Sequence, residues 1–94
     1  MARSLLPTYS VEWSPRAKRD VDAIHASIAI DAPLAAVRFT ERLVAAGDSL
    51  ERHPRRGRAK GKAREFVIVP PYVIRYRIAG SLVVILRVKH GSRR

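Results

Sequence analysis

The chain has 94 residues, 47 % of them hydrophobic, and contains no cysteine. A chain of this length buries roughly 60–65 % of its unfolded surface, which provides one core and excludes a second. The lack of cysteine excludes a disulfide framework and a thiolate zinc site, and it fits a reducing cytoplasm. No stretch has the length of a signal segment or a membrane span, so we expect a cytoplasmic protein without a membrane partner. We predict a single domain over residues 1–94, with residues 1–7 and 92–94 flexible.

The net charge of +11 is unevenly distributed. Residues 1–50 contain six Lys or Arg and six Asp or Glu, whereas residues 51–94 contain thirteen Lys or Arg and only Glu51 and Glu65. The whole excess therefore lies in the second half, and it predicts one strongly positive face that attracts nucleic acid or an acidic protein segment. Solubility alone does not require such segregation.

The first predicted element is a strand at residues 8–13, which alternates Tyr9, Val11 and Trp13 against polar residues. Ser14 and Pro15 then predict a helix start, with serine as N-cap and proline at the first helical position. This helix is expected to run to about residue 30. Its apolar stripe consists of Ala17, Val21, Ile24 and Ile28, and its solvent side of Arg16, Lys18, Arg19, Asp20 and Asp22.

A second helix is predicted after Pro33, with Asp31 as its cap and an end at His53-Pro54. It should form an antiparallel hairpin with the first helix. Its predicted stripe consists of Ala36, Phe39, Leu43, Ala46 and Leu50, widened by Val37 and Val44. Gly47 is unfavourable inside a helix, and a close helix crossing would explain it.

Residues 52–64 contain seven Lys or Arg and no large apolar side chain, which predicts a basic loop. Three strands follow, at 65–69, 72–78 and 82–89. In the second of them Tyr72 and Tyr76 alternate with Arg75 and Arg77, so the tyrosines should face the core. The register of the last hairpin stays open: a three-residue loop places Tyr76 opposite Val84, and a two-residue turn places it opposite Ile85.

The predicted order β-α-α-β-β-β defines an α+β fold, in which a helical hairpin packs on an antiparallel sheet. This pattern resembles the RelE/ParE superfamily of type II toxin–antitoxin toxins. The resemblance covers nearly the whole chain. It rests on the helical pair around Pro33 and on VEWSPRA at 11–17, HPRRGR at 53–58, REFV at 64–67, YVIRYRI at 72–78 and VILRVKHG at 84–91.

The resemblance implies a plasmid-stabilisation-like toxin that is neutralised by a cognate ParD-like antitoxin in a heteromeric complex. The acidic C-terminal segment of such an antitoxin folds on the toxin, which agrees with the charge distribution. We predict that its carboxylates contact Arg55, Arg56, Arg58, Arg75 and Arg77. The superfamily has two branches: ParE-like members resemble inhibitors of DNA gyrase, and RelE-like members cleave mRNA on the ribosome.

For mRNA cleavage, a proton-transfer group and cations are needed around the scissile phosphate. The candidates are His90, Arg75, Arg77 and Arg87, with Arg64, Glu65 and Lys89 nearby. In ribonuclease members that resemble this chain, an arginine commonly follows the position matched to Tyr72, and an aromatic residue follows the histidine. Here these places hold Val73 and Gly91, so no catalytic residue is favoured and His90 is interpreted as a structural histidine at a strand end.

By contrast, the V-x-H-G motif with a short basic tail resembles the ParE branch, whose C-terminal segment has been tied to gyrase inhibition. The predicted target contact consists of Leu86, Arg87, Val88, Lys89, His90, Gly91, Ser92, Arg93 and Arg94. A tail that contacts only solvent is the alternative.

A third hypothesis is a non-toxic nucleic-acid-binding module in which Tyr72 and Tyr76 stack on a single strand. Strand alternation favours a core role for these tyrosines instead. The sequence predicts no metal site and no cofactor, because His25, His53 and His90 are far apart and the glycines form no nucleotide-binding motif.

Overall fold

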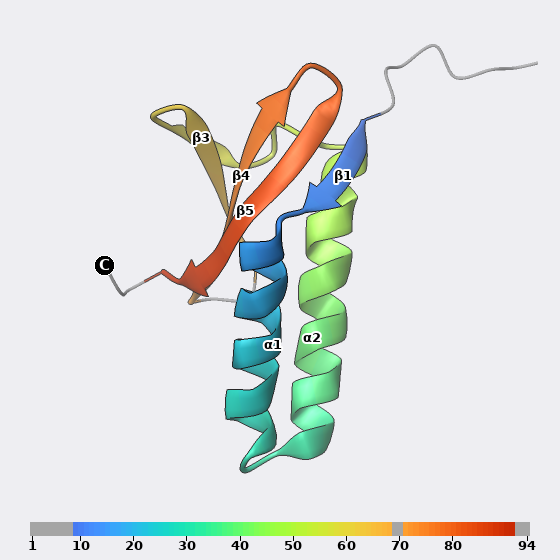
Figure 1. Ribbon diagram of the computed structural model, residues 1–94, viewed down its shortest axis with the longest axis vertical. Coiled ribbons are helices and arrows are strands. Elements are labelled where there is room, and N and C mark those ends of the chain that lie inside the picture. The colour runs from blue at the N-terminus through green and yellow to red at the C-terminus, as the bar shows by residue number, and fades with distance from the viewer. Residues whose placement is uncertain (1–8, 69–70, 92–94) are drawn as a thin grey trace, which may run out of the picture.

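The computed structural model describes residues 9–68 and 71–91 and contains one sheet covered by two helices (Figure 1). The predicted flexible segments 1–7 and 92–94 lie outside the described residues. The helical elements are α1 (Pro15–Ala29), α2 (Pro33–Asp48) and a single 3-10 turn, η1 (Ser49–Glu51). The strands are β1 (Ser10–Trp13), β2 (Arg58–Lys60), β3 (Ala63–Val67), β4 (Tyr72–Ala79) and β5 (Leu82–His90).

The sheet has the strand order β1-β5-β4-β3-β2. Strands β2 to β5 are antiparallel neighbours, but β1 pairs parallel to β5, with Ser10 opposite Leu82. The sheet is therefore mostly antiparallel, as predicted, and β1 is the one described strand that pairs in parallel. A parallel pair requires a long crossover, which here is formed by the helices and the rest of the sheet.

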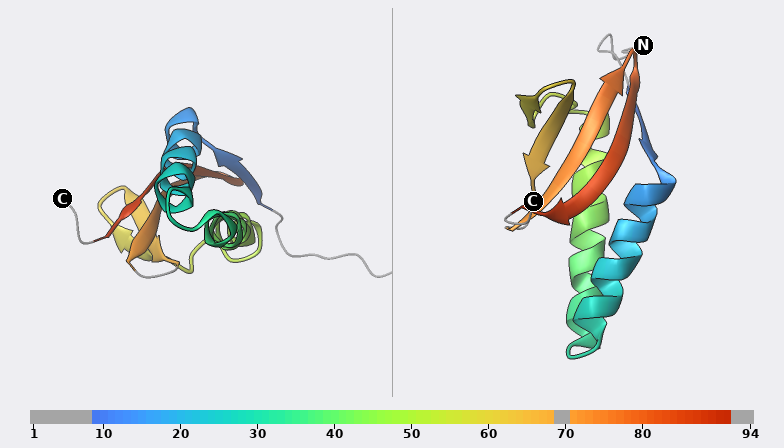
Figure 2. Two further views of the ribbon diagram at one scale, coloured as in Figure 1. Left: turned by 90° about the horizontal axis from the view of Figure 1, so that it is seen from below. Right: turned by 60° about the vertical axis from the view of Figure 1, so that its left-hand side comes forward.

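Both helices lie on the same face of the sheet and extend beyond it to the turn at residues 30–32 (Figures 1 and 2). The predicted cap of α1 is confirmed, because the backbone N–H of Ala17 donates to Ser14 Oγ at 3.0 Å. The predicted cap of α2 was wrong: Pro33 begins the helix, so the N-cap position falls on Ala32 rather than Asp31, and no side chain caps it.

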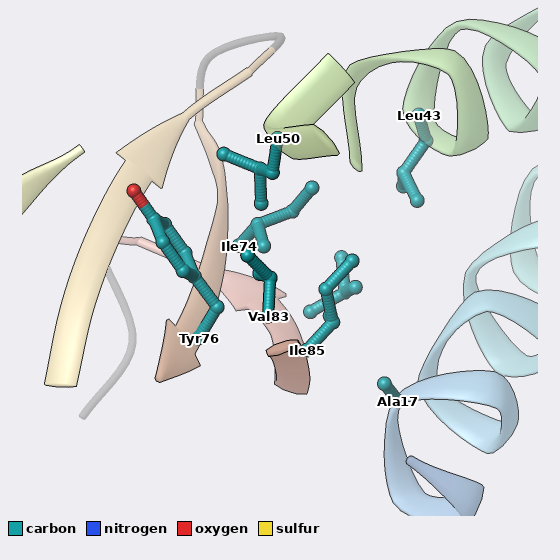
Figure 3. Packing of buried hydrophobic residues seen from close by; sticks show 8 residues of the cluster. Ala17, Leu43, Leu50, Ile74, Tyr76, Val83 and Ile85 are labelled. Atoms are coloured by element: carbon teal, nitrogen blue, oxygen red, sulfur yellow. The ribbon is translucent and has the colours of Figure 1, made fainter. Parts of the chain in front are cut away.

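The core lies between the helical hairpin and strands β4 and β5 (Figure 3). Its largest fully buried side chains are Tyr76, Leu43, Leu50, Ile74, Ile85 and Val83. Val37 and Val44 are 46 % and 37 % exposed, so they do not widen the buried face of α2 as predicted. The sheet and α1 together cover only the central stripe of the helix.

Gly47 is required by a close contact, although not by a helix crossing. A Cβ atom there would lie 2.4 Å from Cζ2 of Trp13 and 3.0 Å from Cδ1 of Ile85. The indole of Trp13, whose Nε1 donates to Asp48 Oδ1 at 3.1 Å, occupies the space next to the helix backbone. The glycine therefore allows β1 and β5 to approach the end of α2.

The predicted basic loop is partly a strand. Residues 58–60 pair with β3 as an exposed edge strand, and β3 begins at Ala63, earlier than expected. Main-chain pairing needs no apolar side chain, and basic residues are common on edge strands because they oppose further pairing. Sequence periodicity therefore could not detect β2.

The hairpin between β4 and β5 uses the two-residue turn, with Gly80 at φ 61° and Ala79 opposite Leu82. Tyr76 consequently lies opposite Ile85, which decides between the two predicted registers. The pairing then shifts, so that Arg75 lies opposite Arg87 and Leu86 is an extra residue in β5. Within residues 9–68 and 71–91, neither helix is long and apolar enough to cross a membrane.

Candidate functional site

The basic segment between η1 and β3 is held in place by the hydroxyl group of Tyr76. This hydroxyl donates to the Pro54 carbonyl at 2.7 Å and accepts from the Gly57 N–H at 3.0 Å. The guanidinium of Arg64 donates to the carbonyls of Arg55 and Gly57 at 3.0 and 2.7 Å. The backbone of the segment is thus held in place by hydrogen bonds to the hydroxyl group of a core tyrosine and to the guanidinium of Arg64.

Arg56 folds back onto the protein from this segment. Its guanidinium carbon lies 4.5 Å from the ring centroid of Phe66, and its Nη1 donates to Ser49 Oγ at 3.0 Å. The stacking interaction and the hydrogen bond fix this cation at the end of the helical hairpin.

A row of charged residues crosses the sheet on the face opposite the helices, which we call the open face. Arg58, Glu65, Arg75 and Arg87 are successive Cα partners on β2, β3, β4 and β5. Cross-strand partners project from the same face, and Arg77 follows Arg75 at the two-residue spacing of that face. Three of the predicted antitoxin-contacting arginines, Arg58, Arg75 and Arg77, are therefore brought together.

Glu65 is the acidic residue in the middle of this row. Its carboxylate lies 3.7 Å from Lys60 Nζ and 3.8 Å from Lys89 Nζ. One carboxylate is thus shared by two lysines, and it lies between Arg58 and Arg75 in the strand register. The positive charge of the open face is only partly compensated.

Asp20 joins α1 to β5 beyond the point where β1 ends. Its Oδ2 accepts from Arg87 Nε at 2.8 Å and from the Val88 N–H at 2.9 Å. Burial raises the pKa of this carboxyl. The hydrogen bonds from Arg87 and Val88 and the charge of Arg87 together lower it by more, so the pKa lies below its ordinary value of 3.8. The prediction that Asp20 lies on the solvent side was wrong, since its side chain is 12 % exposed.

His90 lies at the end of β5 on the face that is covered by the helices. Its ring is 5.4 Å from that of Tyr72, its partner on β4, in an edge-to-face arrangement. Both rings line a hollow of about 540 Å³ whose other wall includes Ile24 and Ser27 of α1. Tyr72 also contacts Phe39, with ring centroids 5.2 Å apart.

The two positions that depart from the ribonuclease pattern contact each other. A Cβ atom on Gly91 would lie 2.8 Å from Cγ2 of Val73 and 2.8 Å from the Pro71 carbonyl oxygen. The Gly91 N–H donates to the same carbonyl. An aromatic side chain at position 91 does not fit this backbone.

The four ribonuclease candidates do not all lie at one site: Arg87 lines the same hollow as His90, but Arg75 and Arg77 do not. His90 is on the helix-covered face with Tyr72, whereas Arg75 and Arg77 belong to the open face. Arg87, which pairs with Arg75, bends towards α1 and is bonded to Asp20. A phosphate could not contact the imidazole and the two β4 arginines from one side of the sheet.

Tyr76 cannot stack on a base, because it is fully buried and its hydroxyl is used by the basic segment. This observation removes one of the two tyrosines on which single-strand stacking depended. Among the described residues, no group of three His, Asp or Glu side chains is arranged to hold a metal ion.

Two structural contacts that shape this region were not predicted from the sequence: the Asp20 bond to β5 and the Tyr76 bond to the basic segment. Their partners are 67 and 22 residues away in the chain, so no local pattern indicated them. Of the predicted target contact, residues 86–91 form the end of β5 and the residue after it, while Ser92, Arg93 and Arg94 lie outside the described residues.

This arrangement of helices and sheet is the fold of toxins from toxin–antitoxin systems. The chromosomal ParDE system from P. aeruginosa matches with a TM-score of 0.80 and 21 % identity, over 90 % of this chain and 98 % of that chain. The toxin–antitoxin complex RelBE2 from Mycobacterium tuberculosis matches with a TM-score of 0.65 and 26 % identity, over 88 % of this chain and 98 % of that chain.

The family model for the ParE toxin of type II toxin–antitoxin systems matches residues 11–94 of the sequence. The chain belongs to this family, which is part of the RelE/ParE superfamily. Toxin RelE2 of Caulobacter vibrioides is 50 % identical over 84 residues, or 88 % of this chain and 96 % of the relative. Toxin RelE1 of the same organism is 41 % identical over 88 residues, or 89 % of this chain and 95 % of the relative. The superfamily inferred from the sequence motifs is thereby confirmed.

Proposed function

We propose that this type II toxin acts by binding and inhibiting DNA gyrase, without a catalytic residue of its own. The observation that carries the proposal is the separation of the ribonuclease candidates, with His90 on one face of the sheet and Arg75 and Arg77 on the other. The contact between Gly91 and Val73 supports it, because both residues depart from the ribonuclease pattern at one corner. The match to the ParE family agrees with this choice.

The toxin is proposed to be neutralised by a cognate ParD-like antitoxin in a heteromeric complex. The solved relatives come from the ParDE and RelBE2 toxin–antitoxin systems. The net charge of +11 favours an acidic antitoxin segment. Its predicted contacts remain Arg55, Arg56, Arg58, Arg75 and Arg77.

The test adds the purified protein to gyrase and relaxed plasmid and measures both supercoiling and trapped, cleaved DNA. Lost supercoiling that the antitoxin restores is the expected result. The same preparation is added to translating ribosomes, where intact mRNA is expected. Ribosome-dependent cleavage with fully active gyrase contradicts the proposal.

A ribosome-dependent mRNA ribonuclease is the second candidate, and it is favoured by the names of the two Caulobacter relatives, which are RelE toxins. In that mechanism His90 would transfer the proton, and His90→Ala would abolish cleavage of mRNA.

The contribution of the C-terminal tail to target binding is tested by deletion of residues 92–94, which removes two arginines. The matched control, Arg38→Gln/Arg42→Gln, removes two exposed arginines from α2. We expect the deletion alone to lose gyrase inhibition while antitoxin binding is retained. Full inhibition by the shortened protein would show that the tail makes no target contact.

A further inference from the structure

The open face of the sheet carries more cations than its acidic residue can neutralise. The side chains of Arg58, Arg75 and Arg77 make no ion pair or hydrogen bond within the described part of the chain. Lys60 and Lys89 share the single carboxylate of Glu65. The excess positive charge is concentrated on β2 and β4, where Arg58 and Arg75 lie on either side of Glu65 in the strand register.

We propose that the open face binds the phosphate backbone of duplex DNA. Adjacent strands are about 4.8 Å apart, so Arg58 and Arg75, two strands apart, span roughly 10 Å. Duplex DNA carries one negative charge per roughly 1.7 Å of its axis with both strands counted, so a length of roughly 10 Å holds about six phosphates, of which the face can contact those on one side of the duplex. Guanidinium groups suit this role because they bind phosphate oxygens in a bidentate manner.

Duplex rather than single-stranded nucleic acid is favoured by the aromatic residues, none of which is available on the open face. The chain has six, and all of them are described. Four pack against the core cluster, Tyr76 is fully buried, and Tyr72 packs against Phe39 and His90 on the helix-covered face. Single-strand binding depends on stacking of bases on aromatic rings, whereas backbone contacts by cations alone suit an unopened duplex.

The inference rests on the proposed gyrase inhibition, since duplex DNA is the substrate of gyrase. A toxin that contacts both enzyme and DNA would gain affinity for their complex over either one alone. The predicted antitoxin contacts include Arg58, Arg75 and Arg77, so antitoxin and DNA would compete for the same face. Binding of the antitoxin would then directly block the contact between the toxin and the DNA of the gyrase–DNA complex.

The experiment measures fluorescence anisotropy of a labelled duplex of about two helical turns, titrated with the full-length protein in the absence of gyrase. A single strand of the same length serves as comparison, at salt concentrations from about 50 to 200 mM. The test variant is Arg75→Glu/Arg77→Glu. The matched control is Arg38→Glu/Arg42→Glu, which makes the same charge change on α2, on the other side of the sheet.

The wild type is expected to prefer the duplex and to lose affinity steeply with salt. The β4 variant should bind roughly 10–100-fold more weakly, and its slope of log K against log salt should be smaller by about 2, since each phosphate contact contributes about 0.9. The α2 control should stay close to wild type. If the glutamates prevent folding, as checked by circular dichroism, Arg75→Gln/Arg77→Gln is used instead. This variant is also expected to bind the duplex more weakly than the wild type and the α2 control.

Equal losses in the two variants would mean that only net charge matters, and this outcome overturns the proposal. Tighter binding to the single strand also overturns it. Unchanged duplex binding by the β4 variant with loss of antitoxin binding assigns the face to the antitoxin instead. A wild type that inhibits gyrase without binding DNA refutes this inference alone, whereas DNA binding without gyrase inhibition refutes the proposed function and leaves the DNA-binding face standing.

Discussion

Asp20 holds the last strand against the first helix, and Asp20→Asn tests how much stability this contact contributes. The amide has almost the same shape as the carboxylate, so packing is retained while the negative charge is removed. Arg87 Nε and the Val88 N–H both donate to Oδ2, at 2.8 and 2.9 Å, so the amide oxygen can still accept both bonds but without the charge that strengthens them. The amide NH2 group then takes the place of Oδ1, where it faces another donor, Arg16 Nε, at 3.4 Å. Arg87 then loses its counterion.

Hydrogen bonds to a charged group contribute about 1.5–3 kcal/mol each, and neutral ones about 1 kcal/mol. Because the Arg87 side chain is 37 % exposed, solvent screening reduces its share. We therefore expect Asp20→Asn to lower the free energy of unfolding by about 1–3 kcal/mol at neutral pH. The corresponding decrease in Tm is about 4–8 °C per kcal/mol for a domain of this size.

The pH dependence follows from the direction of the pKa shift. The folded state holds the pKa of Asp20 below its ordinary value of 3.8. The stabilisation is therefore fully present above the unfolded pKa and is lost as the pH falls through the folded pKa. The stability difference between wild type and Asp20→Asn should be constant near neutrality and should shrink below about pH 4.

The assay is urea unfolding, followed by circular dichroism, at a series of pH values. The matched control is Asp22→Asn, because Asp22 is exposed on the same helix and its side chain makes no ion pair or hydrogen bond with another described residue. The control should stay within about 0.5 kcal/mol of wild type. Equal stabilities of Asp20→Asn and wild type at pH 7, or a difference that persists unchanged at pH 3, would refute the reasoning.

Two further substitutions test contacts that fix the loop and the helix end. Tyr76→Phe keeps the buried ring but removes the hydroxyl from Gly57 and Pro54, so it should destabilise the protein by about 1–3 kcal/mol and accelerate hydrogen exchange at the Gly57 amide; unchanged exchange would contradict the anchoring role. Gly47→Ala places a methyl group against Trp13, and we expect a loss of about 1–3 kcal/mol despite the better helix propensity. A more stable alanine variant in urea unfolding would show that the indole moves without cost.

Local chemistry in the sequence was sufficient for much of the fold. Ser14 and Pro15 predicted the start of α1, because an N-cap and a proline at the first helical position act within one helical turn. Alternation of Tyr72 to Ile78 predicted that Ile74 and Tyr76 are buried, since the side-chain period of a strand is local, although Val73 on the opposite side of β4 is buried as well. The motifs at residues 11–17 and 84–91 predicted the superfamily, which the comparisons confirm.

Tertiary structure decided what depended on distant partners. Strand β2 exists because β3 pairs with it, although its own side chains gave no strand pattern. Asp20 was assigned to the solvent side because its partner, Arg87, is 67 residues away. The separation of His90 from Arg75 depends on the register of β4 and β5 with its shift at Leu86. Main-chain pairing and long-range charge contacts form only when distant segments meet. The sequence alone could therefore assign faces within β4 by alternation, but it could not tell how His90 and Arg87 of β5 would lie relative to Arg75 and Arg77.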